Sequence, residues 1–202
     1  KYDTYYSQNS VMKYALDRFL KDAKTDDKQL LEALELLRNW NLSNQKENTA
    51  AALALLTFKI TYNIKDFQYD YQTIMNQFKE SVDFLINEFG QIDVPLGQLQ
   101  ILKRGEVMLP LDGGPDLLRA VYSKMINNRK VATHGDCFFQ MVDWDQNSNL
   151  SVESIHQFGS ATLDGSSKHY SDQAYLFSNK EMKPSWIELD SIKNHLKTSY
   201  TP

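Results

Sequence analysis

Three residues that could form a catalytic triad lie close together in the stretch GSSKHYSDQAYLF, residues 165–177. They are Ser167, His169 and Asp172. In a serine hydrolase the histidine takes the proton of the serine, and the aspartate orients the imidazole from behind. Triad members usually come from separate elements, and this stretch shows neither a strand–elbow–helix setting nor an oxyanion hole. A structural polar corner is therefore the favoured interpretation, and a self-contained triad is the alternative.

The same stretch has the residue types of a loop that leads into a short helix. Ser171 or Asp172 is expected to cap a helix within DQAYLF, because short polar side chains accept hydrogen bonds from the first helical N–H groups. His169 and Tyr170 are expected to donate to loop carbonyl groups. On this interpretation the side chains bond to backbone groups of neighbouring loops and stabilise a corner of the fold.

A second polar stretch, DWDQNSNLSVE, begins like a calcium-binding loop with Asp143, Asp145 and Asn147 at alternate positions. An EF-hand loop then requires glycine at the sixth position and glutamate at the twelfth, whereas Ser148 and Ser154 stand there. Alternating hydrophobic residues on both sides favour strands over the helices of an EF-hand. The pattern predicts a hairpin turn without calcium.

Scattered histidines and one cysteine offer two further candidate sites. His134, Asp136, His156 and His169 could converge on a metal, but the sequence contains no HExxH pair and no CxxC pair. Hydrogen-bonded histidines at loop corners are the favoured interpretation. Cys137 could be a nucleophile assisted by His134, yet it begins the apolar run CFFQMV, where a small buried thiol is commoner. The sequence thus predicts no metal site and no cofactor.

Charge and hydropathy argue against a nucleic-acid-binding protein and against a membrane-spanning one. The net charge of −4 disfavours nucleic-acid binding, which requires a basic face. No apolar run reaches the eighteen residues that a membrane span needs, and the chain shows no signal peptide.

The first half of the chain is expected to consist of helices that must position these polar stretches. Apolar residues recur at three-to-four spacing, which is typical of amphipathic helices. Thr25 or Asp26 is the expected N-cap of the second helix, and Gly90 the expected C-terminal cap of the fourth. The third is apolar on most faces and is expected to be central. The predicted helices cover residues 11–23, 25–40, 47–62 and 70–90.

The second half changes to strands and loops. LLRAVYSK fits a strand or a short helix, whereas residues 135–145 and 150–160 predict a β-hairpin around DQNSN. Helices followed by antiparallel strands indicate an α+β fold. The expected division is a mainly helical part, 1–90, and a strand-rich part, 91–202, that together form one structural unit.

The order of several short motifs is more specific than any single motif. A proline and a glycine precede an Arg-Gly pair, a GGPD stretch follows, and a Gly-Asp pair opens a strand. Then come serine, one variable residue, His-Tyr, one residue and Asp-Gln, followed by Lys-Pro and a tryptophan. The residues concerned are Arg104, Gly105, Gly113, Gly114, Pro115, Asp116, Gly135, Asp136, Ser167, His169, Tyr170, Asp172, Gln173, Lys183, Pro184 and Trp186.

This order strongly resembles the C-terminal end of the penicillin amidase family, and most closely its acyl-homoserine-lactone acylase and aculeacin-type branch. The likeness runs from about residue 28 to about residue 187. It implies an N-terminal nucleophile hydrolase with an αββα core, made from a precursor that cuts itself into two chains. The new N-terminal serine attacks an acyl amide, its own α-amine is the base, and backbone and asparagine donors hold the oxyanion.

The resemblance places those catalytic groups upstream of this chain, so it assigns no catalytic residue here. Lys1 is not a serine, threonine or cysteine and cannot be the nucleophile. The ten motif residues expected to be structural are Gly113, Gly114, Asp116, Gly135, Asp136, Ser167, His169, Tyr170, Asp172 and Gln173.

The resulting hypothesis is the C-terminal portion of an acylase that hydrolyses N-acyl substrates such as acyl-homoserine lactones or penicillins. Its partner would be the upstream part of the same precursor, and the resemblance implies a periplasmic or secreted location. The alternatives are a non-enzymatic interaction module on the same scaffold and a stand-alone hydrolase that uses Ser167, His169 and Asp172.

Overall fold

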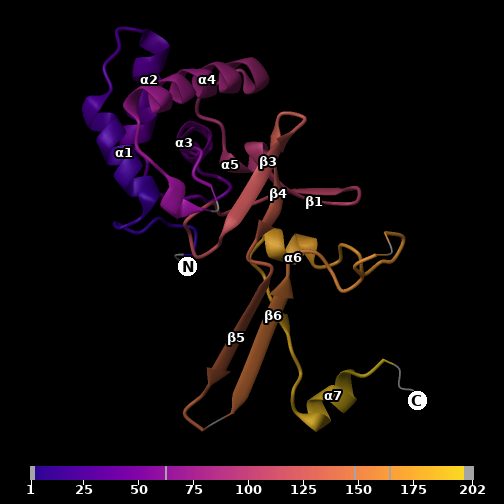
Figure 1. Ribbon diagram of the computed structural model, residues 1–202. Helices are drawn as coiled ribbons and strands as arrows, with labels where there is room; N and C mark the ends of the chain where they lie inside the picture. Colours follow the sequence, from indigo (N-terminus) through magenta and orange to yellow (C-terminus); the bar gives the residue numbers. More distant parts are fainter. Residues whose placement is uncertain (1–2, 62, 148, 164, 198–202) are drawn as a thin grey trace. The chain divides into compact units, whose positions relative to one another are not determined.

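The computed structural model describes residues 3–61, 63–147, 149–163 and 165–197. Helices come first and mainly antiparallel strands later, which confirms the predicted α+β class (Figure 1). The chain forms two compact units, residues 1–136 and 137–202. The last long helix of the first half ends at Phe89, but the compact units divide between Asp136 and Cys137. The expected division into a mainly helical part, 1–90, and a strand-rich part, 91–202, of one structural unit stays a prediction.

The helices of the first unit follow the sequence pattern closely. Asp27 caps the second helix by accepting from the backbone N–H groups of Gln29 and Leu30, so the expected cap at Thr25 or Asp26 is wrong by one or two positions. Gly90 ends the fourth helix at a φ of 75°, as predicted. The helices are α1 (Val11–Asp22), α2 (Lys28–Arg38), α3 (Ala51–Phe58), the 3₁₀ turn η1 (Ile64–Asp66), α4 (Tyr71–Phe89) and the short α5 (Leu96–Leu99).

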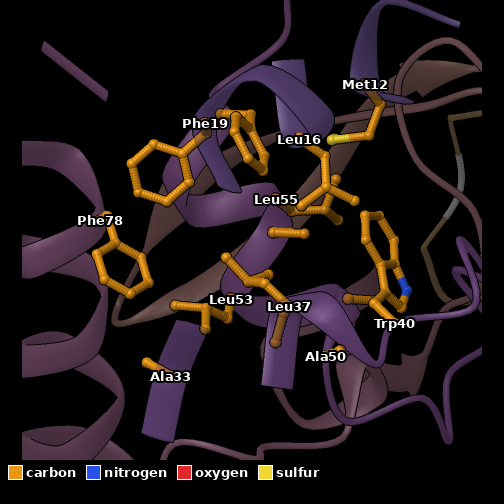
Figure 2. Close-up of a cluster of buried hydrophobic side chains, with 14 of the residues drawn as sticks. Met12, Leu16, Phe19, Ala33, Leu37, Trp40, Ala50, Leu53, Leu55 and Phe78 are labelled. Carbon is orange, nitrogen blue, oxygen red and sulfur yellow. The ribbon is translucent and has the colours of Figure 1, made fainter. Parts of the chain in front are cut away.

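Helix α3 is the centre of the hydrophobic core but is shorter than predicted. Asn48 Oδ1 accepts hydrogen bonds from the backbone of Ala50 and Ala51, each at 3.0 Å, so the helix starts only there. It ends where Lys59 adopts a left-handed φ of 45°. Figure 2 shows side chains of several helices gathered together, among them Phe19 of α1, Leu53 of α3 and Phe78 of α4.

Aromatic side chains join the helices of this core. Phe19 of α1 lies edge-on to Phe78 of α4, with ring centroids 5.3 Å apart, and to Phe58 of α3 at 6.0 Å. All three rings are buried. Because these residues come from three helices, burial of the rings fixes the packing of α1, α3 and α4 together.

A four-stranded sheet completes the first unit, in the order β2-β1-β4-β3. Its neighbours are antiparallel except for β1 and β4, where Gln100 and Ile101 lie parallel to Lys130 and Val131. LLRAVYSK contributes a strand rather than a helix, since β3 begins within it. The strands are β1 (Gln100–Arg104), β2 (Val107–Pro110), β3 (Val121–Ile126) and β4 (Arg129–Gly135).

The second unit contains the predicted hairpin. Strands β5 (Phe138–Trp144) and β6 (Leu150–His156) pair antiparallel, with Phe138 opposite His156 and Trp144 opposite Leu150. The short β7 (Lys183–Pro184) adds to β6, giving the order β5-β6-β7. Helices α6 (Ala174–Ser178) and α7 (Leu189–His195) follow the loop and β7 respectively.

Candidate functional site

The Ser167–Asp172 loop contains a histidine–carboxylate pair but no assembled triad. His169 Nδ1 and Asp172 Oδ2 lie 2.7 Å apart, with 52% and 37% of the two side chains exposed. Ser167 Oγ instead accepts a hydrogen bond from the backbone N–H of His169, at 3.2 Å. Among the described residues no hydrogen bond joins the imidazole to the serine hydroxyl, so the loop lacks the contact that would activate a nucleophile.

The backbone of this loop is fastened to the end of β6. Gln173 N donates to Phe158 O at 2.8 Å, and Gln173 Oε1 accepts from His156 N at 3.1 Å. Ala161 N donates to His169 O at 3.0 Å. Gln173 is buried, and its amide oxygen satisfies a backbone N–H at the end of the strand.

Close packing at Gly159 adds to this attachment. A side chain here would place its Cβ 2.2 Å from His169 O and 2.6 Å from Asp172 Oδ1, both far inside normal contact distances. The loop therefore lies directly on the backbone of Gly159, and a glycine is required for that approach.

The expected cap of the helix after this loop is wrong in detail. The N-cap of α6 is Gln173, with no side-chain capping bond, rather than Ser171 or Asp172. Ser171 contributes its carbonyl oxygen, which accepts from Ala174 N at 3.1 Å. The Asp172 carboxylate lies beside the His169 ring instead, so the hydrogen-bond partner of that imidazole is a side chain and not the expected loop carbonyl group.

The GGP motif forms a second corner, within the first unit. Gly113 N donates to Asn44 O at 2.9 Å, and Asn44 Nδ2 donates to the Tyr6 hydroxyl at 3.2 Å. A Cβ on Gly114 would lie 2.3 Å from Asn44 Nδ2. Burial raises the pKa of Tyr6 above its ordinary range, so the phenol stays protonated beside the amide.

Gln100 supports the same corner from the start of β1. It is fully buried, and its Nε2 donates to Leu111 O at 3.0 Å and to Gly113 O at 2.9 Å. Its Oε1 has no hydrogen-bond partner among the described residues. One amide group therefore satisfies two carbonyl groups of the segment that leads into the GGP motif.

Asp116 and Arg119 connect this corner to the N-terminal segment. Asp116, at a left-handed φ of 59°, accepts from the Val11 backbone N–H through Oδ2 at 2.8 Å. Arg119 Nε donates to Asp3 Oδ2 at 2.8 Å, and the Arg119 side chain is 6% exposed. These contacts join positions more than 100 residues apart in the sequence.

The Gly135-Asp136 motif joins the end of β4 to Ala120, the residue before β3. Asp136 N donates to Ala120 O at 3.0 Å, and Asp136 Oδ2 accepts from Ala120 N at the same distance. Gly135 has a φ of 147°, and a Cβ there would lie 2.0 Å from Ala120 O. Both motif residues are thus used to hold two backbone segments together.

The candidate metal ligands are engaged elsewhere in the described parts of the chain. No group of three His, Cys, Asp or Glu side chains suited to a metal occurs there. The His134 ring stacks on Tyr122, with centroids 5.1 Å apart, and the His156 ring lies 4.9 Å from that of Phe138.

Asp145 closes the turn of the hairpin. Its Oδ1 accepts from the backbone of Asn147 and Asn149, each at 2.8 Å, and its Oδ2 accepts from Asn149 Nδ2 at 2.7 Å. The bond from the Asn149 side chain, and after it the backbone bonds, lower the pKa of the carboxyl. Ser148, the sixth position of the compared calcium loop, lies outside the described residues. The carboxylate that a calcium loop would use is thus bonded to the turn itself.

Cys137 is exposed, which corrects the expectation of a buried thiol. It precedes β5, whose residues are almost all exposed, so the apolar run CFFQMV does not enter a core within its own unit. An apolar run predicts burial only where another layer covers it.

The comparison with protein families matches the penicillin amidase model over residues 2–194. The chain belongs to the penicillin amidase family. The matched range is longer at both ends than the stretch from about residue 28 to about residue 187 over which the motifs show the resemblance. A search of curated proteins gives no match. Among solved structures, a thermostable penicillin G acylase from Alcaligenes faecalis is similar, with 13% identity and a TM-score of 0.43. That alignment covers 98% of this chain and 47% of the acylase chain, so the chain spans about half of that structure's length.

In this penicillin amidase family chain, the residues that sequence reasoning missed are buried polar partners of the motifs. They include Tyr6, Asn44, Gln100 and Arg119. Asn44 lies in NLSNQ, which indicates a turn, and nothing in those letters shows that the asparagine is buried. The prolines and glycines near Gln100 were the available signal for a buried polar partner. Glycines permit two backbone segments to approach closely, and a side chain such as that of Gln100 can then bond to both.

Proposed function

We propose that this chain is the C-terminal portion of an acylase that hydrolyses the amide bond of N-acyl substrates through an N-terminal serine outside the chain. The family match over residues 2–194 carries this proposal. The bonds of the motif residues support it, because Gly113, Gly135, Asp136 and Gln173 are all in contact with backbone groups. Contacts of this kind support a scaffolding role for these residues.

The chemistry of the whole acylase would then be divided along the protein. Upstream, the α-amine of the nucleophilic serine takes the hydroxyl proton while the oxygen attacks the amide carbon, and donors stabilise the oxyanion. The part described here would hold its neighbouring elements in register. Acyl-homoserine lactones, penicillins and related acyl amides are the proposed substrates.

The exposed strand β5 supports an assembly with further polypeptide. It lies at the edge of its sheet, and Phe138, Met141, Val142 and Trp144 are each 43–64% exposed. Open edges with apolar side chains invite pairing, and native proteins normally cover them. We propose that the upstream part of the same precursor covers this edge.

A periplasmic or secreted location is proposed from the family alone. No helix among the described residues is long and apolar enough to cross a membrane.

The direct test measures amide hydrolysis by the purified 202-residue chain and by the chain produced together with the upstream part of its precursor. Penicillin G and an acyl-homoserine lactone are the substrates. We expect turnover only in the second preparation. Hydrolysis by the chain alone that is lost in Ser167→Ala but kept in the control Ser160→Ala would instead establish the local triad.

A further inference from the structure

A cavity in the first unit lies between the end of α3 and strands β3 and β4. Its volume is about 360 Å³, which falls within the usual range of roughly 300–1,000 Å³ for small-molecule sites. Leu55, Ile60 and Val121 provide apolar lining, and Thr61 and Thr133 add hydroxyl groups. Gln100 and Pro115, which belong to the corner at the GGP motif, line the cavity as well.

The charged lining of the cavity is entirely basic among the described residues. Lys59 follows α3, Lys124 lies on β3 and Lys130 lies on β4, and none of the described residues that line the space is acidic. Lys59 Nζ is 3.7 Å from Glu80 Oε2 at an exposed position, where screening by water makes the pairing weak. Neither Lys124 nor Lys130 forms an ion pair with any residue in the described ranges.

Lys130 is the most enclosed of these lysines. It is partly buried, and its pKa is lowered by that burial and, to a lesser degree, by the positive charge of Lys59. Loss of water and a like charge both disfavour an ammonium group. A negative charge within the cavity would remove this penalty by pairing with Lys130 and screening it from Lys59.

We propose that this cavity binds a monocarboxylate with an apolar body. The carboxylate would lie at Lys130 and Lys59 and accept from the Thr61 hydroxyl, because the Thr133 hydroxyl already donates to Tyr122 O, while the hydrocarbon part packs on Leu55, Ile60 and Val121. A small, strongly hydrated anion such as phosphate would leave that apolar lining unfilled. A neutral alcohol of the same length would leave the ammonium group unpaired.

Isothermal titration calorimetry on the 202-residue chain tests the site with octanoate as the probe, and with octan-1-ol and inorganic phosphate as comparisons. We expect one octanoate per chain, and an affinity at least ten times higher than for either comparison. Lys130→Met should weaken octanoate binding at least tenfold, and Lys59→Met should weaken it less. Lys103→Met, on the exposed surface of β1, is the matched control and should bind as the unchanged chain does.

Three results would overturn the site: no octanoate binding at millimolar concentration, equal binding by Lys130→Met, or phosphate binding as tight as octanoate binding. Far-UV circular dichroism shows whether each variant keeps its helices, and Lys59→Met gives an independent reading if Lys130→Met does not fold. Binding is measured without turnover, so the outcome is separate from that of the proposed amide hydrolysis.

Discussion

Replacement of Gln100 tests whether the GGP corner depends on one buried amide. Gln100→Met keeps a side chain of similar length but removes both donations, to Leu111 O at 3.0 Å and to Gly113 O at 2.9 Å. Gly113 O retains a longer hydrogen bond from Asn44 Nδ2, at 3.4 Å, whereas no second side-chain donor to Leu111 O is seen among the described residues. The variant therefore leaves at least one buried carbonyl group without its side-chain partner.

The expected cost follows from these two bonds. A hydrogen bond contributes about 0.5–1.5 kcal/mol net, so the loss of both lowers the free energy of unfolding by about 1–3 kcal/mol. In a chain of this length, 1 kcal/mol corresponds to about 2–4 °C in Tm, which gives a decrease of roughly 2–12 °C. Gln100→Ala should cost more, because it adds a cavity to the same loss.

Thermal unfolding followed by far-UV circular dichroism measures this effect, because helices α1 to α4 of the first unit supply most of the signal. Gln98→Met is the control, since Gln98 is exposed two residues earlier on α5. It should change Tm by less than 1 °C, in line with the small effect of surface substitutions. A Gln100→Met variant that melts with the unchanged chain, or a control that loses as much, would refute the reasoning.

Three further outcomes are expected. Gly135→Ala should lower Tm strongly, because the added Cβ would lie 2.0 Å from Ala120 O. The φ of Gly135 also costs other residues about 1–3 kcal/mol of conformational free energy. An unchanged Tm would contradict this. Asp145→Ala should destabilise the hairpin above the ordinary aspartate pKa, and this difference should shrink as the pH falls through the lowered pKa, because the stabilising form is the carboxylate. Amide exchange in β5 and β6 across a series of falling pH values measures it, and a difference that does not shrink on acidification would count against it. Asp172→Ala should lower Tm modestly, because it removes the partner of His169. The control substitution Lys168→Ala, at an exposed position in the same loop, should leave Tm unchanged. Equal effects would argue against a structural role for the pair of His169 and Asp172.

Most individual elements could be predicted from local patterns. Apolar spacing indicated the helices of the first half, and Gly90 marked the end of α4 because glycine adopts a left-handed φ at low cost. Alternation around DQNSN indicated the hairpin β5–β6. Boundaries were less secure: Asn48 shortens α3 by bonding to two backbone N–H groups, a contact that periodicity does not reveal.

The candidate site was predicted as a set of motifs but not as a set of contacts. His169 and Asp172 pair with each other rather than with backbone groups of neighbouring loops, and the Gln173 side chain is the one that bonds to the end of β6. The structural role of His169 and Asp172 therefore stays a prediction. The cavity lined by Lys59 and Lys130 had no signal in the sequence, because each lysine by itself is typical of a solvated surface.

By itself, then, the sequence determined the α+β class, the helix and hairpin positions and the family, because each depends on short periodic patterns or on motifs in a fixed order. Only the tertiary structure decided which polar residues are buried and which backbone groups they satisfy. Arg119 and Asp3 are 116 positions apart, and Asn44 and Gly113 are 69 apart. Such pairs depend on the packing of the apolar faces of the helices, since burial removes the water that would otherwise satisfy the same polar groups.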